Sequence, residues 1–139
     1  MELTYGKGVI GKLKKMKVLI IGLRGLGVET AKNLILAGPK AVTLHDDEKV
    51  VIADLGANFY LKESHIGEPR AASSFPDLSD ANPNCKVSVH TGELDDVFLA
   101  GFDVVVSTDD APAEELIRRN EIVRVNGKYI QAAINVAFN

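Results

Sequence analysis

The sequence predicts an α/β domain with three layers and a mostly parallel sheet. Short apolar, β-branched segments alternate along the chain with segments of helical periodicity, which indicates strands joined by helical crossovers. Such crossovers are right-handed and place helices on both faces of a parallel sheet. A glycine-rich turn, Gly22 to Gly27, joins the first strand to the first long helix, which is typical of Rossmann-like folds. We therefore expect residues 1–139 to form a single Rossmann-like domain.

The first half of the chain contains two predicted strands. The basic segment 12–17 indicates a short helix, or a helix end, before the apolar run 18–21, a strand that we expect to be buried on both faces. From Val28 to Ala37 apolar residues recur at helical spacing, and Gly38 ends the helix. The second strand is expected at 41–44. A loop with a short helix is expected at 50–61.

The second half contains three more strands and two longer helices. Pro76 argues against a regular helix in one of them, because proline removes a helical hydrogen bond. In chain order the expected elements are a helix over 70–80, a strand over 86–90, a helical turn over 97–100, a strand over 102–107, a helix over 112–125 and a strand over 129–134. The sequence ends at Asn139, soon after the last strand and without a closing helix, so we expect a C-terminal truncation.

Composition excludes several classes of function. The net charge of −3 favours neither nucleic acid nor an anionic membrane as a partner. No apolar run approaches the ~20 residues of a membrane span. The single cysteine, Cys85, has no nearby cationic run that would activate it, so we expect a structural thiol and a reducing compartment. His45, His65 and His90 lie far apart without a CxxC partner, so no metal site is predicted.

The glycine-rich turn lacks one of the three glycines that a nucleotide-binding turn uses. Gly22 and Gly27 fill the places that permit the tight turn and the close packing of helix on strand. Arg24 fills the place at which bare backbone approaches phosphate, and Gly25 follows one residue late. Arg24 could turn outward and pair with a phosphate. The interpretation that we favour is a turn retained for the fold alone.

Two aspartates follow the second strand, where a Rossmann fold places the acidic residue that holds a ribose. Asp46 occupies that place, and Asp47 is the alternative. Both could instead cap the loop that follows them. The sequence leaves these two interpretations open.

Several stretches in order resemble the first, inactive adenylation-like domain of ubiquitin-activating enzymes, within the ThiF/MoeB-like activating-enzyme superfamily. The matching stretches are 22–29 with 31–33, 40–46, 53–55 with 59–61, 66–67 with 70–71, 91–92, and 101–102 with 104–106. The resemblance covers nearly the whole chain and weakens after about Asp110.

The resemblance implies a function for the parent protein. In this family two homologous halves form a pseudo-dimer, of which one binds ATP and magnesium and adenylates ubiquitin, and a separate domain takes ubiquitin as a cysteine thioester. The resemblance places this chain in the other half. The implied partners are then the active half and ubiquitin, with ubiquitin-conjugating enzymes binding through other domains, in the cytoplasm and nucleus. No cofactor is implied for the fragment itself.

The active half of the family carries an Asn-Leu-Asn-Arg-Gln-Phe signature that holds ATP phosphates, and the matching stretch here is 54–59. Its arginine place holds Ala57, its second asparagine place Gly56 and its glutamine place the shorter Asn58. A lysine of the active half falls near Glu68, which reverses the charge. We therefore assign no catalytic residue. Gly22, Gly25, Gly27 and Asp46 are predicted to form a vestigial cofactor turn.

Three further features are open to interpretation. Asp109 falls near the magnesium aspartate of the active half, but with Asp110 and Pro112 it also suits a helix N-terminus, which we favour. The family's inactive half has an arginine before the first helix that reaches the partner's ATP. Residues 3–6 hold none, and Lys7 is an imperfect substitute.

A charged helix face is predicted for Arg118 and Arg119 with Glu114 and Glu115, solvated and held by i,i+4 pairs, although the same face could contact a partner.

Two other assignments remain open. One is the regulatory subunit of a related activating enzyme for another ubiquitin-like protein. The other is a nicotinamide-dependent dehydrogenase domain, against which Arg24 argues.

Overall fold

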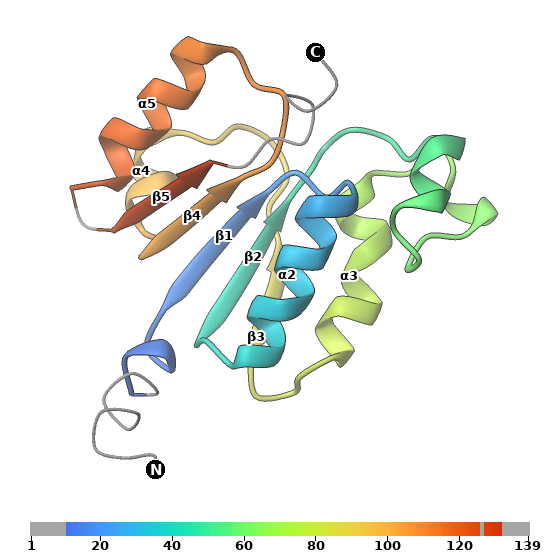
Figure 1. Cartoon of the computed structure of the whole chain (residues 1–139), viewed down its shortest axis with the longest axis horizontal. Coiled ribbons are helices and arrows are strands. Elements are labelled where there is room, and N and C mark those ends of the chain that lie inside the picture. Colours follow the sequence, from blue (N-terminus) through green and yellow to red (C-terminus); the bar gives the residue numbers. More distant parts are fainter. Residues whose placement is uncertain (1–10, 126, 132–139) are drawn as a thin grey trace.

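The computed structural model describes residues 11–125 and 127–131. These residues form a five-stranded sheet with helices on both faces (Figure 1). In sheet order the strands are β3 (Lys86–Val89), β2 (Ala41–His45), β1 (Lys17–Ile21), β4 (Val104–Ser107) and β5 (Lys128–Gln131). Every neighbouring pair is parallel. The predicted Rossmann-like α/β fold is confirmed. The end of the expected fifth strand, 132–134, lies outside the described residues.

The central position of strand β1 explains the continuous apolar run at residues 18–21. This strand pairs with β2 on one side and with β4 on the other, and its residues Val18 to Ile21 are at most 1% exposed. A strand that is covered on both faces needs apolar side chains at successive positions rather than at alternate ones.

Helices cover the two faces of the sheet, so the domain has three layers (Figure 1). Helices α2 (Gly25–Ala37) and α3 (Arg70–Asp80) pack on one face around a core that includes Ile20, Ile35 and Leu78. Helices α4 (Asp96–Ala100) and α5 (Ala113–Val123) pack on the other face around Leu19, Leu99 and Val123. None of the described helices is long and apolar enough to span a bilayer.

The connection from β2 to α3 crosses one end of the sheet and contains two short 3-10 helices, η1 (Ile52–Gly56) and η2 (Glu63–His65). An antiparallel bridge between Lys49 and Pro69 closes its two ends. This agrees with the predicted loop and short helix, and it brings the segment after β2 beside the start of α3.

Three details differ from the sequence prediction. Helix α2 begins at Gly25 rather than Val28, because the glycine turn passes directly into the helix. Pro76 lies inside α3 without ending it, since Ser74 and Leu78 on either side of it are buried in the core. On α5 the helical spacing predicts one apolar side with Leu116, Ile117 and Ile122, but Ile117 is exposed, whereas Val123 is buried.

Candidate functional site

A cleft of about 290 Å³ opens beyond the carboxyl ends of β1, β2 and β4. This is the point at which the strand order reverses, because β1 leads to β2 on one side and β4 lies on the other. In open α/β sheets ligands bind at such a switch point. The cleft is lined by Ile21, Gly22, Arg24, His45, Asp46, Asp47, Glu48, Arg70, Thr108, Asp109 and Asp110.

The glycine turn forms one wall of the cleft, and packing explains two of its glycines. Gly22 has φ +94°, and its N–H donates to the carbonyl of His45 at 2.9 Å. A Cβ at Gly27 would lie 1.8 Å from the carbonyl oxygen of Gly22, so no other residue fits there. Thr108 of the neighbouring loop donates its hydroxyl to the Gly22 carbonyl at 2.9 Å. A Cβ at Gly25 would only touch that of Ala57, at 3.2 Å.

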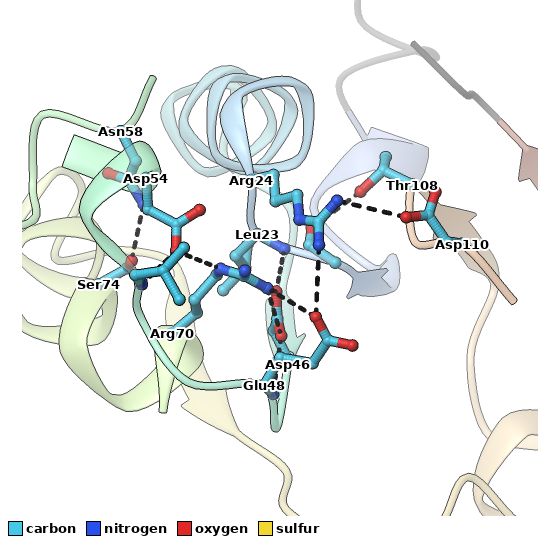
Figure 2. A network of polar contacts seen from close by, with 12 residues as sticks. Leu23, Arg24, Asp46, Glu48, Asp54, Asn58, Arg70, Ser74, Thr108 and Asp110 are labelled. Atoms are coloured by element: carbon cyan, nitrogen blue, oxygen red, sulfur yellow. Dashed lines mark hydrogen bonds and ion pairs between the residues drawn. The ribbon is translucent and has the colours of Figure 1, made fainter. Parts of the chain in front are cut away.

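Arg24 precedes α2 and places its guanidinium across the mouth of the cleft (Figure 2). One nitrogen lies 3.5 Å from a carboxylate oxygen of Glu48, and another lies 3.3 Å from one of Asp110. The first partner follows β2 and the second follows β4, so this side chain bridges the two loops that flank β1. In this structure the guanidinium is therefore engaged by carboxylates of its own chain.

Asp46 is buried and holds both the turn and the loop that follows it. One carboxylate oxygen accepts the N–H of Leu23 at 2.8 Å, and the other accepts the N–H of Glu48 at 3.0 Å. These hydrogen bonds agree with the interpretation that Asp46 caps the loop that follows it. Asp47 turns to a different loop and accepts the N–H of Gly92 at 2.9 Å.

Arg70, which the sequence analysis did not single out, is the centre of the polar network behind the cleft (Figure 2). It is 3% exposed. Its Nε donates to Asp54 at 2.9 Å, and its NH1 lies 3.3 Å from both Asp46 and Glu48. Burial lowers the pKa of Arg70, but the hydrogen bond to Asp54 and the two aspartate charges raise it above its ordinary value overall. The one available signal was an arginine directly after Pro69 at a helix start.

The stretch 54–59 contributes structure to this network and no cation. Asp54 accepts the N–H of Val51 at 2.9 Å besides pairing with Arg70. Asn58, which is buried, donates its amide to Ser74 Oγ at 3.0 Å and accepts the N–H of Tyr60 at 3.0 Å. The polar side chains of the stretch 54–59 therefore hold the β2–α3 connection against α3.

Asp109 precedes the N-terminus of a helix, as predicted, but its side chain does not cap that helix. Helix α5 begins at Ala113, after Pro112, and has no side-chain cap. Asp109 instead accepts two hydrogen bonds from Arg119, at 2.9 and 3.1 Å. Arg119 also donates to Ser107 Oγ at 3.0 Å.

The solvated face predicted for α5 is wrong at Arg119, which is 5% exposed, although the predicted i,i+4 pair forms between this residue and Glu115 at 3.0 Å. Buried arginine is stable only when its donors are paired. The prediction holds better for Arg118, which is partly exposed and pairs with Glu115 and Asp96. The hydrogen bond from Arg118, with that from Arg119, holds the pKa of Glu115 below its ordinary value despite partial burial.

Cys85 lies in the core, and burial raises the pKa of its thiol above the ordinary value. A raised pKa leaves less of the reactive thiolate at neutral pH. Within residues 11–125 and 127–131, no group of three or more His, Cys, Asp or Glu side chains is arranged to hold a metal ion. Lys7 and residues 3–6 lie outside the described residues.

The electrostatics of the cleft follow from its lining. Its carboxylates are those of Asp46, Asp47, Glu48, Asp109 and Asp110. Among the described residues, two guanidinium groups line the cleft with them, those of Arg24 and Arg70, while Arg119 pairs with Asp109 from outside the lining. Both guanidinium groups are already paired with carboxylates. A polyanion that entered the cleft would meet an excess of negative charge.

Comparisons with known proteins agree with this geometry. The model of the ThiF family matches residues 2–136. Ubiquitin-like modifier-activating enzyme 1 of Homo sapiens is 47% identical over 124 residues, which are 89% of this chain and 12% of that protein. Ubiquitin-activating enzyme E1 1 of Candida albicans is 40% identical over 136 residues, or 97% of this chain and 13% of that protein.

Solved structures show the same fold. A crystal structure of E. coli MccB with ATP superposes with a TM-score of 0.75 at 26% identity, covering 89% of this chain and 38% of that one. E. coli tRNA N6-threonylcarbamoyladenosine dehydratase, TcdA, in complex with AMP gives a TM-score of 0.75 at 19% identity, covering 91% of this chain and 54% of that one, and so supports the fold alone. Since the family model spans nearly the whole sequence, this chain belongs to the ThiF family and is homologous to ubiquitin-like modifier-activating enzyme 1.

Proposed function

We propose that this chain is the non-catalytic adenylation half of a ubiquitin-activating enzyme. The parent enzyme would adenylate ubiquitin with ATP and magnesium and pass it to a cysteine as a thioester. Relatives from Candida albicans and wheat, at 40% and 46% identity, are named ubiquitin-activating enzymes, which supports ubiquitin as the substrate. The chain spans only 12–13% of the human and Candida proteins, so the chemistry would be completed by other parts of the parent.

The charge of the cleft is the observation that carries the inactive role. Transfer of a phosphoryl or adenylyl group depends on cations that neutralise the phosphates. MccB, with a similar fold, has been crystallised with ATP. In this chain Ala57 stands where the family signature has an arginine, and carboxylates outnumber guanidinium groups in the cleft. The domain would then serve as a scaffold that supports the active half and the bound ubiquitin.

The remaining parts of the proposal concern the parent protein. The active half would hold ATP and magnesium, and ubiquitin-conjugating enzymes would bind through other domains. We place the parent in the cytoplasm and nucleus. A related activating enzyme for another ubiquitin-like protein is the alternative, and relatives named for ubiquitin itself, at 40% and 46% identity, make it the less favoured one.

Calorimetry with ATP and magnesium tests the inactive role directly. The 139-residue protein should give no binding heat up to about 1 mM ATP, which corresponds to less than about 4 kcal/mol of binding free energy. E. coli MccB, measured in the same buffer, is the positive control for the ligand stock. A dissociation constant in the micromolar range for this chain would contradict the proposal.

A further inference from the structure

We propose that Arg24 is an internal latch, which Glu48 and Asp110 hold across the cleft and which masks a residual polyanion site. This inference rests on the proposed function, because it explains how this chain keeps a nucleotide-type cleft without using it. Figure 2 shows the guanidinium of Arg24 with Asp110 on one side and Glu48 on the other. The two ion pairs, at 3.3 and 3.5 Å, connect the loop after β4 to the loop after β2.

The network behind the latch fixes one of its two carboxylates. Glu48 also pairs with the buried Arg70 at 3.3 Å, and its N–H donates to Asp46 at 3.0 Å. Arg70 is in turn held by Asp54 at 2.9 Å. The carboxylate that meets Arg24 is therefore anchored through a buried arginine to the β2–α3 connection. Closing the latch needs little further ordering of its partner.

The same guanidinium is the cation best placed to meet a polyanion in this cleft. Arg24 directly precedes α2, a helix of 13 residues with no side-chain cap at its N-terminus. Arginine binds phosphate oxygens in a charge-assisted, bidentate manner when its nitrogens are available. While Glu48 and Asp110 engage those nitrogens, a phosphate must displace two carboxylates and then face their charge. Removing the two carboxylates should therefore release Arg24.

Inorganic tripolyphosphate is the probe, titrated by calorimetry at low ionic strength because the pairs are exposed and screened by salt. E48Q/D110N should bind it on the order of tenfold more tightly than wild type, since each exposed pair changes an equilibrium by a few fold. Adding R24Q should abolish the gain. D110N alone, which leaves the contact of Glu48 with Arg70 intact, should give a gain of about threefold.

D47N/E93Q is the control for an effect of reduced negative charge that does not involve Arg24. This variant removes two carboxylates as well, one from the cleft lining and one close to Gly92, and leaves both pairs of Arg24 in place. The latch is overturned if E48Q/D110N binds tripolyphosphate no better than D47N/E93Q, or if the gain survives R24Q. Should E48Q/D110N fail to fold, D110N and D110N/R24Q decide by the same comparison.

The two proposals fail in different ways. If wild type binds no ATP and E48Q/D110N shows no gain, the latch is wrong and the inactive role stands. If wild type itself binds ATP with magnesium in the micromolar range, the inactive role is wrong whatever the variants do. Both proposals are supported if wild type binds no ATP and E48Q/D110N binds tripolyphosphate more tightly in a way that depends on Arg24.

Discussion

Replacing Arg70 with methionine should destabilise the domain strongly, because it leaves two buried carboxylates without their cation. Asp46 and Asp54 are each 7% exposed, and Arg70 supplies an ion pair to both. After R70M the carboxylate of Asp46 keeps two backbone N–H donors and that of Asp54 keeps one. Breaking a buried pair in this way lowers the free energy of unfolding by about 3–5 kcal/mol.

Urea denaturation measures this change, with the free energy of unfolding taken from the midpoint and slope of the transition. R24M is the matched control, because it removes an arginine with exposed partners from the same network and should cost about 0–1 kcal/mol. R70M/D54N, from which one stranded charge has also been removed, should be more stable than R70M, because the amide oxygen at position 54 can still accept the N–H of Val51. A free energy of unfolding for R70M within about 1 kcal/mol of that for R24M would refute the buried-pair reasoning.

Three further predictions concern glycine packing and two titrating groups. G27A should lower the free energy of unfolding, measured in urea, by at least about 3 kcal/mol, because the new Cβ would lie 1.8 Å from a backbone oxygen. G56A is the control: the space around Gly56 is open, so this variant should change the free energy of unfolding by less than about 1 kcal/mol. The pKa of the Cys85 thiol is raised in the folded state, so the thiol of the unfolded chain ionises first as pH rises. The melting temperature should therefore fall as pH rises above about 8.5, and C85A should remove this loss. If C85A shows the same dependence of melting temperature on pH as wild type, the reasoning is wrong. Because the pKa of Glu115 is lowered, its contribution to stability should be lost as pH falls below about 4.3, and E115Q should flatten that acid limb.

The order of strands and helices was predictable because burial dictates it locally. The run Val18 to Ile21 can only be a strand covered on both faces, and Gly38, with φ +89°, ends α2 where the sequence indicated. The start of α2 at Gly25 was missed, because glycine scores poorly in helices, although close packing against Gly22 requires the glycine at position 27 in the first turn of this helix. Helix α3 continues beyond Pro76 because the residues on either side of the proline are buried in tertiary contacts.

The polar network behind the cleft was not predictable from spacing. Arg70 meets Asp46 and Asp54 across 24 and 16 residues, and Arg119 meets Asp109 through the fold of the β4–α5 loop. On a helical pattern Arg119 belongs to a charged surface. Only the packing of α5 against β4, which brings Ser107 within 3.0 Å, shows that this arginine is buried. Charged side chains buried by long-range contacts leave no local signal in one sequence.

The glycines of the turn are required for different physical reasons, so the turn can keep its shape whether or not it binds phosphate. Gly27 is required because any side chain there would strike the backbone of Gly22, and Gly22 is required because its φ is +94° and a Cβ there would lie 2.6 Å from the hydroxyl of Thr108. That requirement comes from packing a helix against a strand and holds with or without a ligand. Position 24 carries no such constraint, because Arg24 has an ordinary φ of −81° and points its side chain to solvent-exposed partners. A glycine there is needed only where phosphate approaches the backbone. The absence of glycine at position 24 alone, with Gly22 and Gly27 kept, is therefore what the proposed non-catalytic role predicts for this turn.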